Sequence, residues 1–329
     1  MRDALRFVSG AIKDSAVLPV LSHVAFRAGR VYASNGRVTL SAPVPELSDL
    51  ECTAPAARIL PAVGLDDDSP LAVTGGDAGS PLSIKRMKLR ARIPTGPISA
   101  FPLCAPPESG VKRIATPLLA LCAKLAPFMG SDATHPWACG LALDHRSVAA
   151  TNNVTMAVAP LRKPWPFAPS ILPSHAVAEL LRIAEEPSAW GHDGVSVTAV
   201  YEEHDRWLRA LLLNETWPKD PLDMIRGMSN GAKYTPVPKG LVDAINAVRP
   251  LCLDERAPVV ILEGTTVSTP AGEVGGEVSG FKKFPVKCAF RVEPLLEVLK
   301  LAEEIDFSRF PRVPWRGQGV EGAIAGVHV

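Results

Sequence analysis

The chain has 329 residues, of which 47% are hydrophobic and 21% are charged, and its formal net charge is +1. This length exceeds what one ordinary hydrophobic core supports, so two or three domains are expected. No apolar run approaches a membrane span, the N-terminus lacks the pattern of a secretory signal, and the balanced charge means that any nucleic acid must be met by a local basic surface.

The cysteines lie far apart and form no Cys-x-x-Cys pair: Cys52, Cys104, Cys122, Cys139, Cys252 and Cys288. This spacing argues against a zinc site and against a small disulfide framework. Reduced thiols in a cytoplasmic protein are the expected state, with no metal and no other cofactor.

The first patterned stretch, HVAFRAGRVYASNGRVTLSAPV, runs from His23 to Val44. It predicts a strand through Val31, a turn at Asn35-Gly36 and a second strand through Val38 and Leu40. A helical pattern precedes it, with apolar spacing at Leu5, Val8 and Ile12.

The stretch from Gly140 to Glu186 repeats this form. Its first half, GLALDHRSVAATNNVTMAVAPL, alternates apolar and polar residues and breaks at Asn152-Asn153, which predicts a β-hairpin. Its second half opens with the helix-start signal Pro173-Ser174 and predicts a helix whose packed face carries Val177, Leu180, Leu181 and Ala184.

A third copy, VVILEGTTVSTPAGEVGGEVSG, predicts a hairpin with its turn at Pro270-Gly272. Val31, Val148 and Val267 are equivalent, a period of roughly 118 residues that is far longer than a solenoid repeat. The helical patterns ahead of the second and third hairpins place these residues on their packed faces: Leu118, Leu121, Cys122 and Leu125, and Leu241, Val242, Ile245 and Val248.

A second helix follows each hairpin, in segments that begin at Ala54, Leu172 and Phe290, and further strands close each copy. The sequence therefore predicts an α+β fold in which two helices are backed by antiparallel sheets, three times over. Proline, glycine and serine gather near Pro106–Gly110 and Met228–Ala232. The expected domains are residues 1–108, 109–230 and 231–329.

Taken together, the segments resemble the bacterial-type DNA polymerase sliding clamp, the β subunit of the replicative polymerase, or a phage-encoded version of it. The likeness is carried by VLPVLSHVAF, VAATNNVTMAVAPL, ILPSHAVAELLRI and AFRVEPLLEVLKL. These segments stand in the family's order and cover essentially the whole chain, although each alone is a weak motif.

Three departures from the family are visible. The family begins with a strand ahead of the first helix, whereas Met1 here almost opens the helix, so one edge pairing is expected to be missing or replaced. Val154-Thr155 stands where the family has histidine-arginine. The family's C-terminal methionine-proline pair is absent. These changes bear on partner recognition more than on the fold.

The resemblance implies a non-catalytic DNA clamp: a head-to-tail homodimer whose six similar domains form a ring around duplex DNA. Helices would line the hole and meet phosphates without reading bases. The candidate DNA-facing residues are Arg2, Arg6, Lys13, Arg58, Lys124, Arg182, Lys239, Arg249 and Lys300. The alternative for any one of them is an ordinary solvated helix face.

The resemblance also implies a hydrophobic cleft between the second and third domains for peptides of the polymerase and the clamp loader. Carried over by position, its lining is Ala138, Thr151, Val154, Met156, Pro218, Leu222, Pro314, Ile324 and Gly326. Val154 and Met156 fit a plain strand core equally well. Trp137 stands where the family often has aromatic residues near DNA or the cleft, and a half-buried packing tryptophan is the alternative.

Enzyme motifs are missing from the sequence, which has no G-x-S-x-G, no Walker loop and no H-E-x-x-H. The run Asp66-Asp67-Asp68 favours a solvated turn over a metal site. The alternative function of a different class is a clamp-folded interaction scaffold that binds peptides but does not encircle DNA. The missing first strand and the near-neutral charge favour it.

Overall fold

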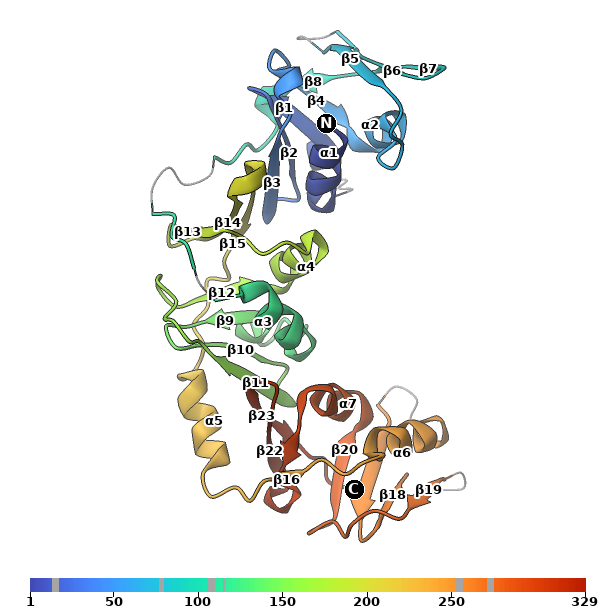
Figure 1. Ribbon diagram of the computed structural model, residues 1–329, viewed down its shortest axis with the longest axis vertical. Coiled ribbons are helices and arrows are strands. Elements are labelled where there is room, and N and C mark those ends of the chain that lie inside the picture. The colour runs from blue at the N-terminus through green and yellow to red at the C-terminus, as the bar shows by residue number, and fades with distance from the viewer. Residues whose placement is uncertain (14–17, 77–79, 106–109, 115, 253–256, 271–274) are drawn as a thin grey trace. The chain divides into compact units, whose positions relative to one another are not determined.

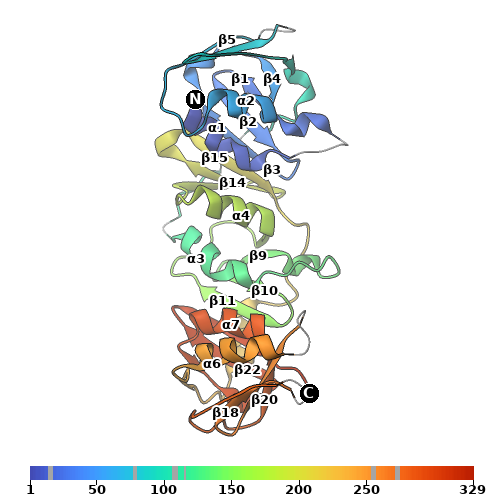
Figure 2. The ribbon, with the colours of Figure 1, turned by 90° about the vertical axis from the view of Figure 1, so that its right-hand side faces the viewer.

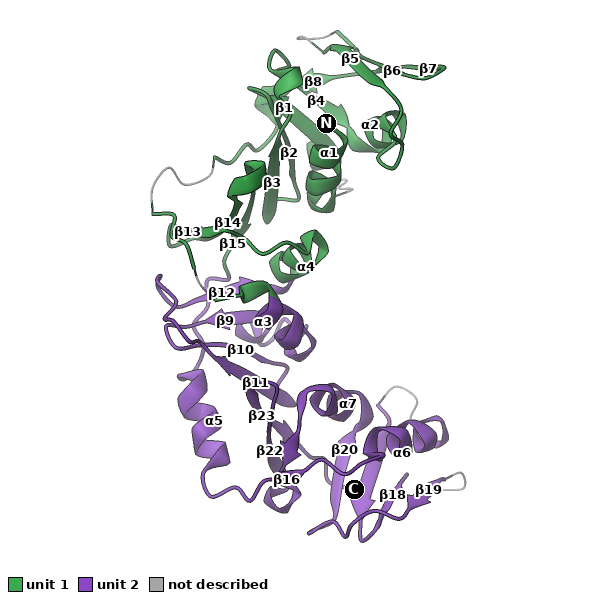
Figure 3. Ribbon diagram, in the orientation of Figure 1, with its two compact units in different colours: residues 1–119, 175–212 green, residues 120–174, 213–329 purple. Residues whose placement is uncertain are grey.

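The structure of the chain, a computed structural model, describes residues 1–13, 18–76, 80–105, 110–114, 116–252, 257–270 and 275–329 (Figure 1). The chain divides into two compact units (Figure 3). Unit 1 comprises residues 1–119 and 175–212, and unit 2 comprises residues 120–174 and 213–329. Within the described ranges no helix is long and apolar enough to cross a membrane. The three domain boundaries stay a prediction, and most of Pro106–Gly110 lies outside the described residues.

The larger sheet of unit 1 is antiparallel and has the strand order β13-β14-β15-β3-β2-β1-β4-β8. It joins strands from both chain segments of the unit, because β15 pairs with β3 and aligns Trp207 with Ser41. Its strands are β1 (His23–Arg27), β2 (Arg30–Ser34), β3 (Val38–Pro43), β4 (Cys52–Pro55), β8 (Gly96–Pro97), β13 (Ala189–His192), β14 (Ser196–Tyr201) and β15 (Arg206–Leu211).

The turn predicted at Asn35-Gly36 is confirmed, and its chemistry is visible. The Asn35 side-chain oxygen accepts hydrogen bonds from the backbone N–H groups of Arg37 (2.9 Å) and Val38 (2.8 Å), which closes the link between β2 and β3. The single strand expected through Val31 is wrong. It is broken into β1 and β2 by a turn at Ala28-Gly29, where both residues have positive φ.

Unit 1 also holds a three-stranded sheet of order β5-β6-β7, made of β5 (Leu71–Gly75), β6 (Leu82–Arg86) and β7 (Leu89–Ile93). Helix α1 (Arg2–Val8) packs on β2 and β3, and α2 (Ala56–Val63) packs on β4, β6 and β7. Gly64 ends α2 in a left-handed conformation and its N–H caps the Leu60 carbonyl. Helix α4 (Ser174–Ile183) has all but its first residue in this unit.

The larger sheet of unit 2 has the order β12-β9-β10-β11-β23-β22-β21-β16. Here β11 pairs with β23 and aligns Met156 with Ala323, so the sheet again joins two distant chain segments. Its strands are β9 (Gly140–Leu143), β10 (Ser147–Thr151), β11 (Thr155–Pro160), β12 (Ser170–Pro173), β16 (Thr235–Pro236), β21 (Glu304–Ile305), β22 (Arg312–Gly317) and β23 (Val320–Ala325).

The hairpin turn at Asn152-Asn153 is confirmed between β10 and β11. The Asn152 side-chain oxygen accepts from the backbone N–H groups of Val154 (3.0 Å) and Thr155 (2.7 Å), and Asn153 adopts positive φ. The sequence pattern did not reveal that β9 forms a further hairpin with β10, nor that β12 covers the other side of β9.

The second sheet of unit 2 has the order β19-β18-β17-β20. Its strands are β17 (Val259–Glu263), β18 (Thr266–Ser268), β19 (Glu277–Ser279) and β20 (Cys288–Arg291). Helices α6 (Leu241–Val248) and α7 (Val292–Leu301) contact each other and lie in front of these strands in Figure 2. Helices α3 (Leu118–Leu125) and α5 (Pro221–Ser229) complete the set.

Several sequence predictions about these elements need correction. Ile12 does not extend the packed face of α1, because the helix ends at Val8 and Ile12 is already extended. Val242 is 39% exposed in α6, and Ala184 is exposed with positive φ just beyond α4. The turn expected at Pro270-Gly272 lies mostly outside the described residues, although β18 and β19 on either side of it do pair.

Candidate functional site

Helix α5 begins at a sequence pattern that is typical of a helix N-terminus. Asp220 is the N-cap and its side chain accepts from the Asp223 backbone N–H at 3.0 Å, while Pro221 occupies the first turn. Leu222 and Ile225 are buried on one face, and this face packs against β10, β11, β22 and β23. The sequence analysis named Pro218 and Leu222 as cleft residues but predicted no helix in this segment.

Four of the predicted cleft residues come from four neighbouring strands of this sheet, and Val154 lies in the turn between β10 and β11. Thr151 of β10 is aligned with Met156 of β11, and Met156 is aligned with Ala323 of β23. Ala323 is in turn aligned with Pro314 of β22. At the end of these strands the Ala325 N–H donates to the Val154 carbonyl at 2.7 Å, and Ile324 is aligned with Thr155. The structure therefore brings Thr151, Met156 and Pro314 together on one face of the sheet, whereas Ile324, next to Ala323 in β23, belongs to the opposite face.

The remaining predicted cleft residues are more scattered. Leu222 joins Met156 in one buried cluster beneath α5, with exposures of 8% and 6%. Ala138 is buried in the turn ahead of β9, and Pro218 is exposed just ahead of α5. Gly326 lies against the Phe310 ring, where a Cβ would be 2.0 Å from a ring carbon, so the absence of a side chain matters there. Val154 and Gly326 are half-buried.

The aromatic and thioether residues beside this cluster were missed or left open by the sequence. Trp217, Met224 and Met228 are half-buried and pack against the cluster. Trp137 meets Trp217 edge to face, with ring centroids 5.2 Å apart. This contact places Trp137 beside the cluster and is compatible with both interpretations of it. The spacing of Leu222, Ile225 and Met228 as i, i+3 and i+6 was the signal that could have revealed α5.

The N-terminal end of α5 is held to the sheet by charge. Arg146, in the turn between β9 and β10, donates to Asp220 at 2.7 Å and lies 3.5 Å from Asp223. Burial alone would raise the pKa of Asp220, but the Arg146 hydrogen bond and the backbone N–H of Asp223 outweigh it and hold this pKa below its usual value. This end of α5 is therefore anchored while both groups are ionised.

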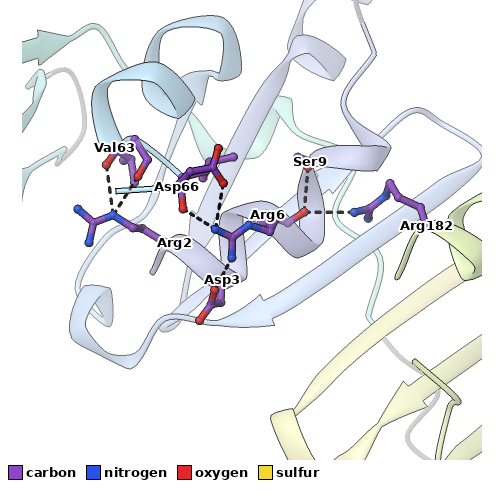
Figure 4. A network of polar contacts seen from close by, with 9 residues as sticks. Arg2, Asp3, Arg6, Ser9, Val63, Asp66 and Arg182 are labelled. Carbon is purple, nitrogen blue, oxygen red and sulfur yellow. Dashed lines mark hydrogen bonds and ion pairs between the residues drawn. The ribbon is translucent and has the colours of Figure 1, made fainter. Parts of the chain in front are cut away.

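The predicted DNA-facing cations fall into two kinds, those bound to other groups of the chain and those that are free, and Figure 4 shows three of the first kind in unit 1. Arg2 is committed to the backbone carbonyls of Gly64 (3.0 Å) and Ser69 (2.6 Å). Arg6 pairs with Asp3 at 2.7 Å. Arg182 pairs with Glu179 at 2.8 Å and donates to the Phe7 carbonyl at 2.6 Å. These guanidinium groups stabilise helix ends and loops.

In unit 2 three more of the predicted cations are bound to a carbonyl or a carboxylate of the chain. Lys124 donates to the Gln318 carbonyl at 2.7 Å, Arg249 pairs with Glu293 at 2.6 Å, and Lys300 pairs with Glu297 at 2.7 Å. Of the nine predicted cations, Lys13, Arg58 and Lys239 are exposed and have no recorded partner among the residues that the structure describes. Exposed pairs are weak, so a phosphate can compete with the carboxylates.

A denser group of cations lies on the hairpin of β6 and β7, which the sequence analysis treated only as closing strands. Lys85 is aligned with Arg90, and Ser83 is aligned with Arg92, so three cations share one face. Lys88 stands at the exposed turn beside Met87, whose exposure is 81%. Like charges placed opposite each other in a sheet are unfavourable unless an anion or a partner neutralises them.

Sites for metals or reactive thiols find little support in the described part of the chain, where no cluster of three metal-ligating side chains occurs. Asp67 accepts from the Ser69 N–H at 2.8 Å and lies 3.5 Å from Arg86, as expected for a turn. Burial raises the pKa of the Cys288 thiol to about 12, so this thiol stays protonated and unreactive.

Comparison with solved structures identifies the fold. The β sliding clamp of Caulobacter crescentus superimposes with a TM-score of 0.82 at 20% identity, over 100% of this chain and 97% of that chain. The DnaN sliding clamp (DNA polymerase III subunit beta) of Bartonella birtlesii, bound to griselimycin, gives 0.83 at 17% identity with the same coverage. The chain has the sliding-clamp fold.

A third solved clamp, that of Helicobacter pylori bound to a DNA ligase peptide, has a TM-score of 0.76 at 17% identity over 100% of this chain and 97% of that chain. No family model and no curated protein matches the sequence. The sliding-clamp fold predicted from the ordered segments is thus confirmed by shape, while the low identity leaves the function to be argued from the residues.

Proposed function

We propose that the chain is a sliding clamp: two copies join head to tail into a ring around duplex DNA in the cytoplasm and tether a polymerase and other partners to it. Its action is mechanical, and no catalytic step is required. The domains would be the three predicted ones, residues 1–108, 109–230 and 231–329.

The element order supports three corresponding copies. Each copy has a helix, four strands, a second helix and three strands. The first copy is α1, β1–β4, α2 and β5–β7, the second is α3, β9–β12, α4 and β13–β15, and the third is α6, β17–β20, α7 and β21–β23. In this correspondence β3, β11 and β19 are equivalent, and so are β7, β15 and β23.

The two internal junctions carry the proposal of a ring. β15, the last strand of the second copy, pairs with β3 of the first, and β23, the last strand of the third copy, pairs with β11 of the second. The same rule leaves β7 of the first copy and β19 of the third copy without a junction partner in the described part of the chain, where both are sheet edges. Pairing β7 with β19 of a second chain, and the reverse, gives a closed heterologous assembly of six copies.

Charge supports this third junction. β7 carries Arg90 and Arg92, whereas β19 carries the exposed Glu277. Leu89 on β7 is 39% exposed in the single chain, an apolar contact that a partner strand would cover. A basic edge and an acidic edge favour head-to-tail pairing over pairing of like edges.

DNA would be held by diffuse attraction. The free cations Lys13, Arg58 and Lys239 lie at or beside helices and can meet phosphates, while the six paired cations would contribute only when phosphate displaces their partners. A weak field suits a protein that must slide, because tight local contacts would fix its position.

Peptide partners would bind on the apolar surface where α5 meets β10, β11, β22 and β23. The clamp of Helicobacter pylori is bound to a DNA ligase peptide, which supports the same use here. Half-buried Val154, Trp217 and Met224 offer aliphatic and aromatic contacts for an extended peptide.

Retention on DNA tests the proposal. Clamps loaded onto a nicked circle, then isolated by gel filtration at high salt, are expected to remain bound and to be released when a restriction enzyme linearises the circle. A single-chain species in sedimentation equilibrium, together with no difference between circular and linear DNA, would instead support the scaffold alternative. That alternative is favoured by the internal pairing of six of the nine predicted cations.

A further inference from the structure

The outer edges of the sheets offer a comparison within the chain itself. In the three proposed copies the fourth strands are β4, β12 and β20, and each has its outer edge covered. β8 pairs with β4, Leu213 bridges to Ile171 of β12, and the Val327 N–H donates to Ala289 of β20 at 2.9 Å. In every case the covering residue follows the last strand of the same copy.

The fifth strands are β5, β13 and β21, and two of them are covered in a second way. Lys112 exchanges two backbone hydrogen bonds with Trp190 of β13, at 2.7 and 2.8 Å. β16 pairs antiparallel with β21. Both covering segments are extended and stand ahead of the first helix of their copy.

β5 is the exception. Among the described residues no strand or bridge pairs with the outer edge of β5. Its burial reflects this: Ala72, Thr74 and Gly75 are exposed, whereas Ala189 and Trp190 of β13 are each 1% exposed. An unpaired edge presents a row of backbone donors and acceptors to a passing strand.

A groove of about 680 Å³ runs along this edge. Leu71, Ala72 and Val73 of β5 line one part of it, and Met1, Asp3 and Glu46 line another. The groove thus lies where the covering segments of the other two copies lie, between a fifth strand and the start of a first helix. Its size suits a short extended segment.

The charged groups that line the groove indicate which kind of peptide segment it can bind. Its two guanidinium groups are engaged, Arg2 with backbone carbonyls and Arg6 with Asp3, and the Met1 ammonium pairs with Glu46 at 3.0 Å. Asp68 is exposed, lines the groove and has no recorded partner among the described residues. Backbone carbonyls carry no formal charge, so Arg2 balances the sum over the lining, but Asp68 is the one lining carboxylate without a cation beside it among the described residues. The internal covering segments are themselves basic, with Lys112-Arg113 in one and Lys233 just ahead of β16 in the other.

We infer that the β5 edge is a second peptide-binding site, which accepts an extended basic segment of another protein as an added antiparallel strand. Backbone hydrogen bonds to β5 supply the attraction, and a Lys or Arg side chain of the partner pairs with Asp68. We rely here on the correspondence of the three copies, but not on the ring or on DNA.

Nuclear magnetic resonance of the full-length ¹⁵N-labelled chain tests this without DNA. The probe is acetyl-Gly-Val-Lys-Arg-Ile-amide, the sequence of residues 110–114, added free or attached ahead of Met1 through a flexible Gly-Ser linker that brings its effective concentration to the millimolar range. The expected result is a shift of the β5 amide signals and slower hydrogen exchange in the attached form. The peptide Gly-Val-Glu-Glu-Ile is expected to give neither.

Asp68→Lys is expected to weaken binding of the free probe about tenfold, the loss of one charge pair. Asp49→Lys makes the same charge change on an exposed residue that does not line the groove, and it should leave binding unchanged. Unprotected β5 amides in the attached form, equal loss in both variants, or shifts at Met156 and Leu222 instead of β5 would each overturn the inference. None of these outcomes touches retention of the clamp on circular DNA.

Discussion

β15 and β7 hold corresponding places in their copies but have different surroundings. β15 pairs with β14 on one side and β3 on the other, and Trp207 and Leu208 are 4% and 0% exposed. Within the described residues β7 pairs with β6 alone, and Leu89 and Arg90 are exposed. The difference teaches that a strand in this place becomes buried when the neighbouring copy supplies a strand for its second edge. β7 has no such strand beside it among the described residues, so it resembles a junction strand whose partner is missing.

Trp207→Ala is expected to lower the free energy of unfolding more than any other variant considered, because it removes a buried ring from the junction between β15 and β3. The Trp207 ring meets Tyr32 edge to face at 6.1 Å across β15, β3 and β2. Truncation of a buried tryptophan costs about 3–5 kcal/mol. Urea unfolding of the isolated chain measures it.

Leu89→Ala, at the corresponding edge, provides the control for Trp207→Ala. Because Leu89 is already 39% exposed in the single chain, the unfolding free energy should fall by less than about 1 kcal/mol. Equal losses for the two variants would remove the distinction between a closed junction and an open one.

Arg90→Glu should disturb the association of two chains while leaving the single chain folded. It reverses a charge on the β7 edge, which we propose faces the acidic β19 edge of the partner. The dimer dissociation constant is expected to rise about tenfold or more, as measured by sedimentation equilibrium at low salt. Arg162→Glu changes the same charge in an exposed loop away from both edges, and no rise is expected. If both variants dissociate alike, general electrostatics accounts for the effect.

The cations at or beside the helices allow a similar comparison, between unpaired cations proposed to face DNA and an exposed cation in a loop. Removing the unpaired side chains in Arg58→Ala and Lys239→Ala is expected to lower the slope of log affinity against log salt by about 0.9 for each phosphate that is no longer neutralised. Fluorescence anisotropy with duplex DNA over a salt series gives the slope. Lys163→Ala, at an exposed loop position, serves as the matched control, and an equal change there would deny any special role to the helices.

The smallest expected effect concerns acid. Because the fold lowers the pKa of Asp220, this group stabilises the folded state above its unfolded pKa of 3.8, and the stabilisation is lost as pH falls through the lower folded pKa. Asp220→Asn should therefore cost up to about 1 kcal/mol at pH 7 and much less at pH 3. Unfolding at the two pH values measures it, with the exposed Glu203→Gln as a control. A constant difference across this range would assign the effect to the cap alone.

The architecture was readable from the sequence because its signals are local and repeated. Asn35 and Asn152 stand at turns where a side chain must accept backbone N–H groups, and hydrophobic spacing marked the helices. Long-range pairing left no such mark: nothing local shows that β15 joins β3, or that β21 needs β16. The predictions of site residues differ in the same way, between what the sequence shows locally and what only the fold shows.

The cleft residues were predicted from the resemblance to the sliding clamp, and the strand register that aligns Thr151 with Met156, and Met156 with Ala323, is visible only in the structure. The cations were harder, because the sequence shows a charge but not the carbonyl or carboxylate that engages it. Arg182 fits a solvated helix pattern, and only the fold reveals that it caps the end of α1.

Unit 1 is made of two chain segments that are separated in the sequence, and this has a consequence for biosynthesis. Residues 1–119 cannot complete their sheet until residues 175–212 are available, because β15 is the neighbour of β3. A ribosome making this chain must therefore release the intervening segment, residues 120–174, before the first unit can close. During that interval β3 is an uncovered edge in the nascent chain, so early chaperone contacts should concentrate on it.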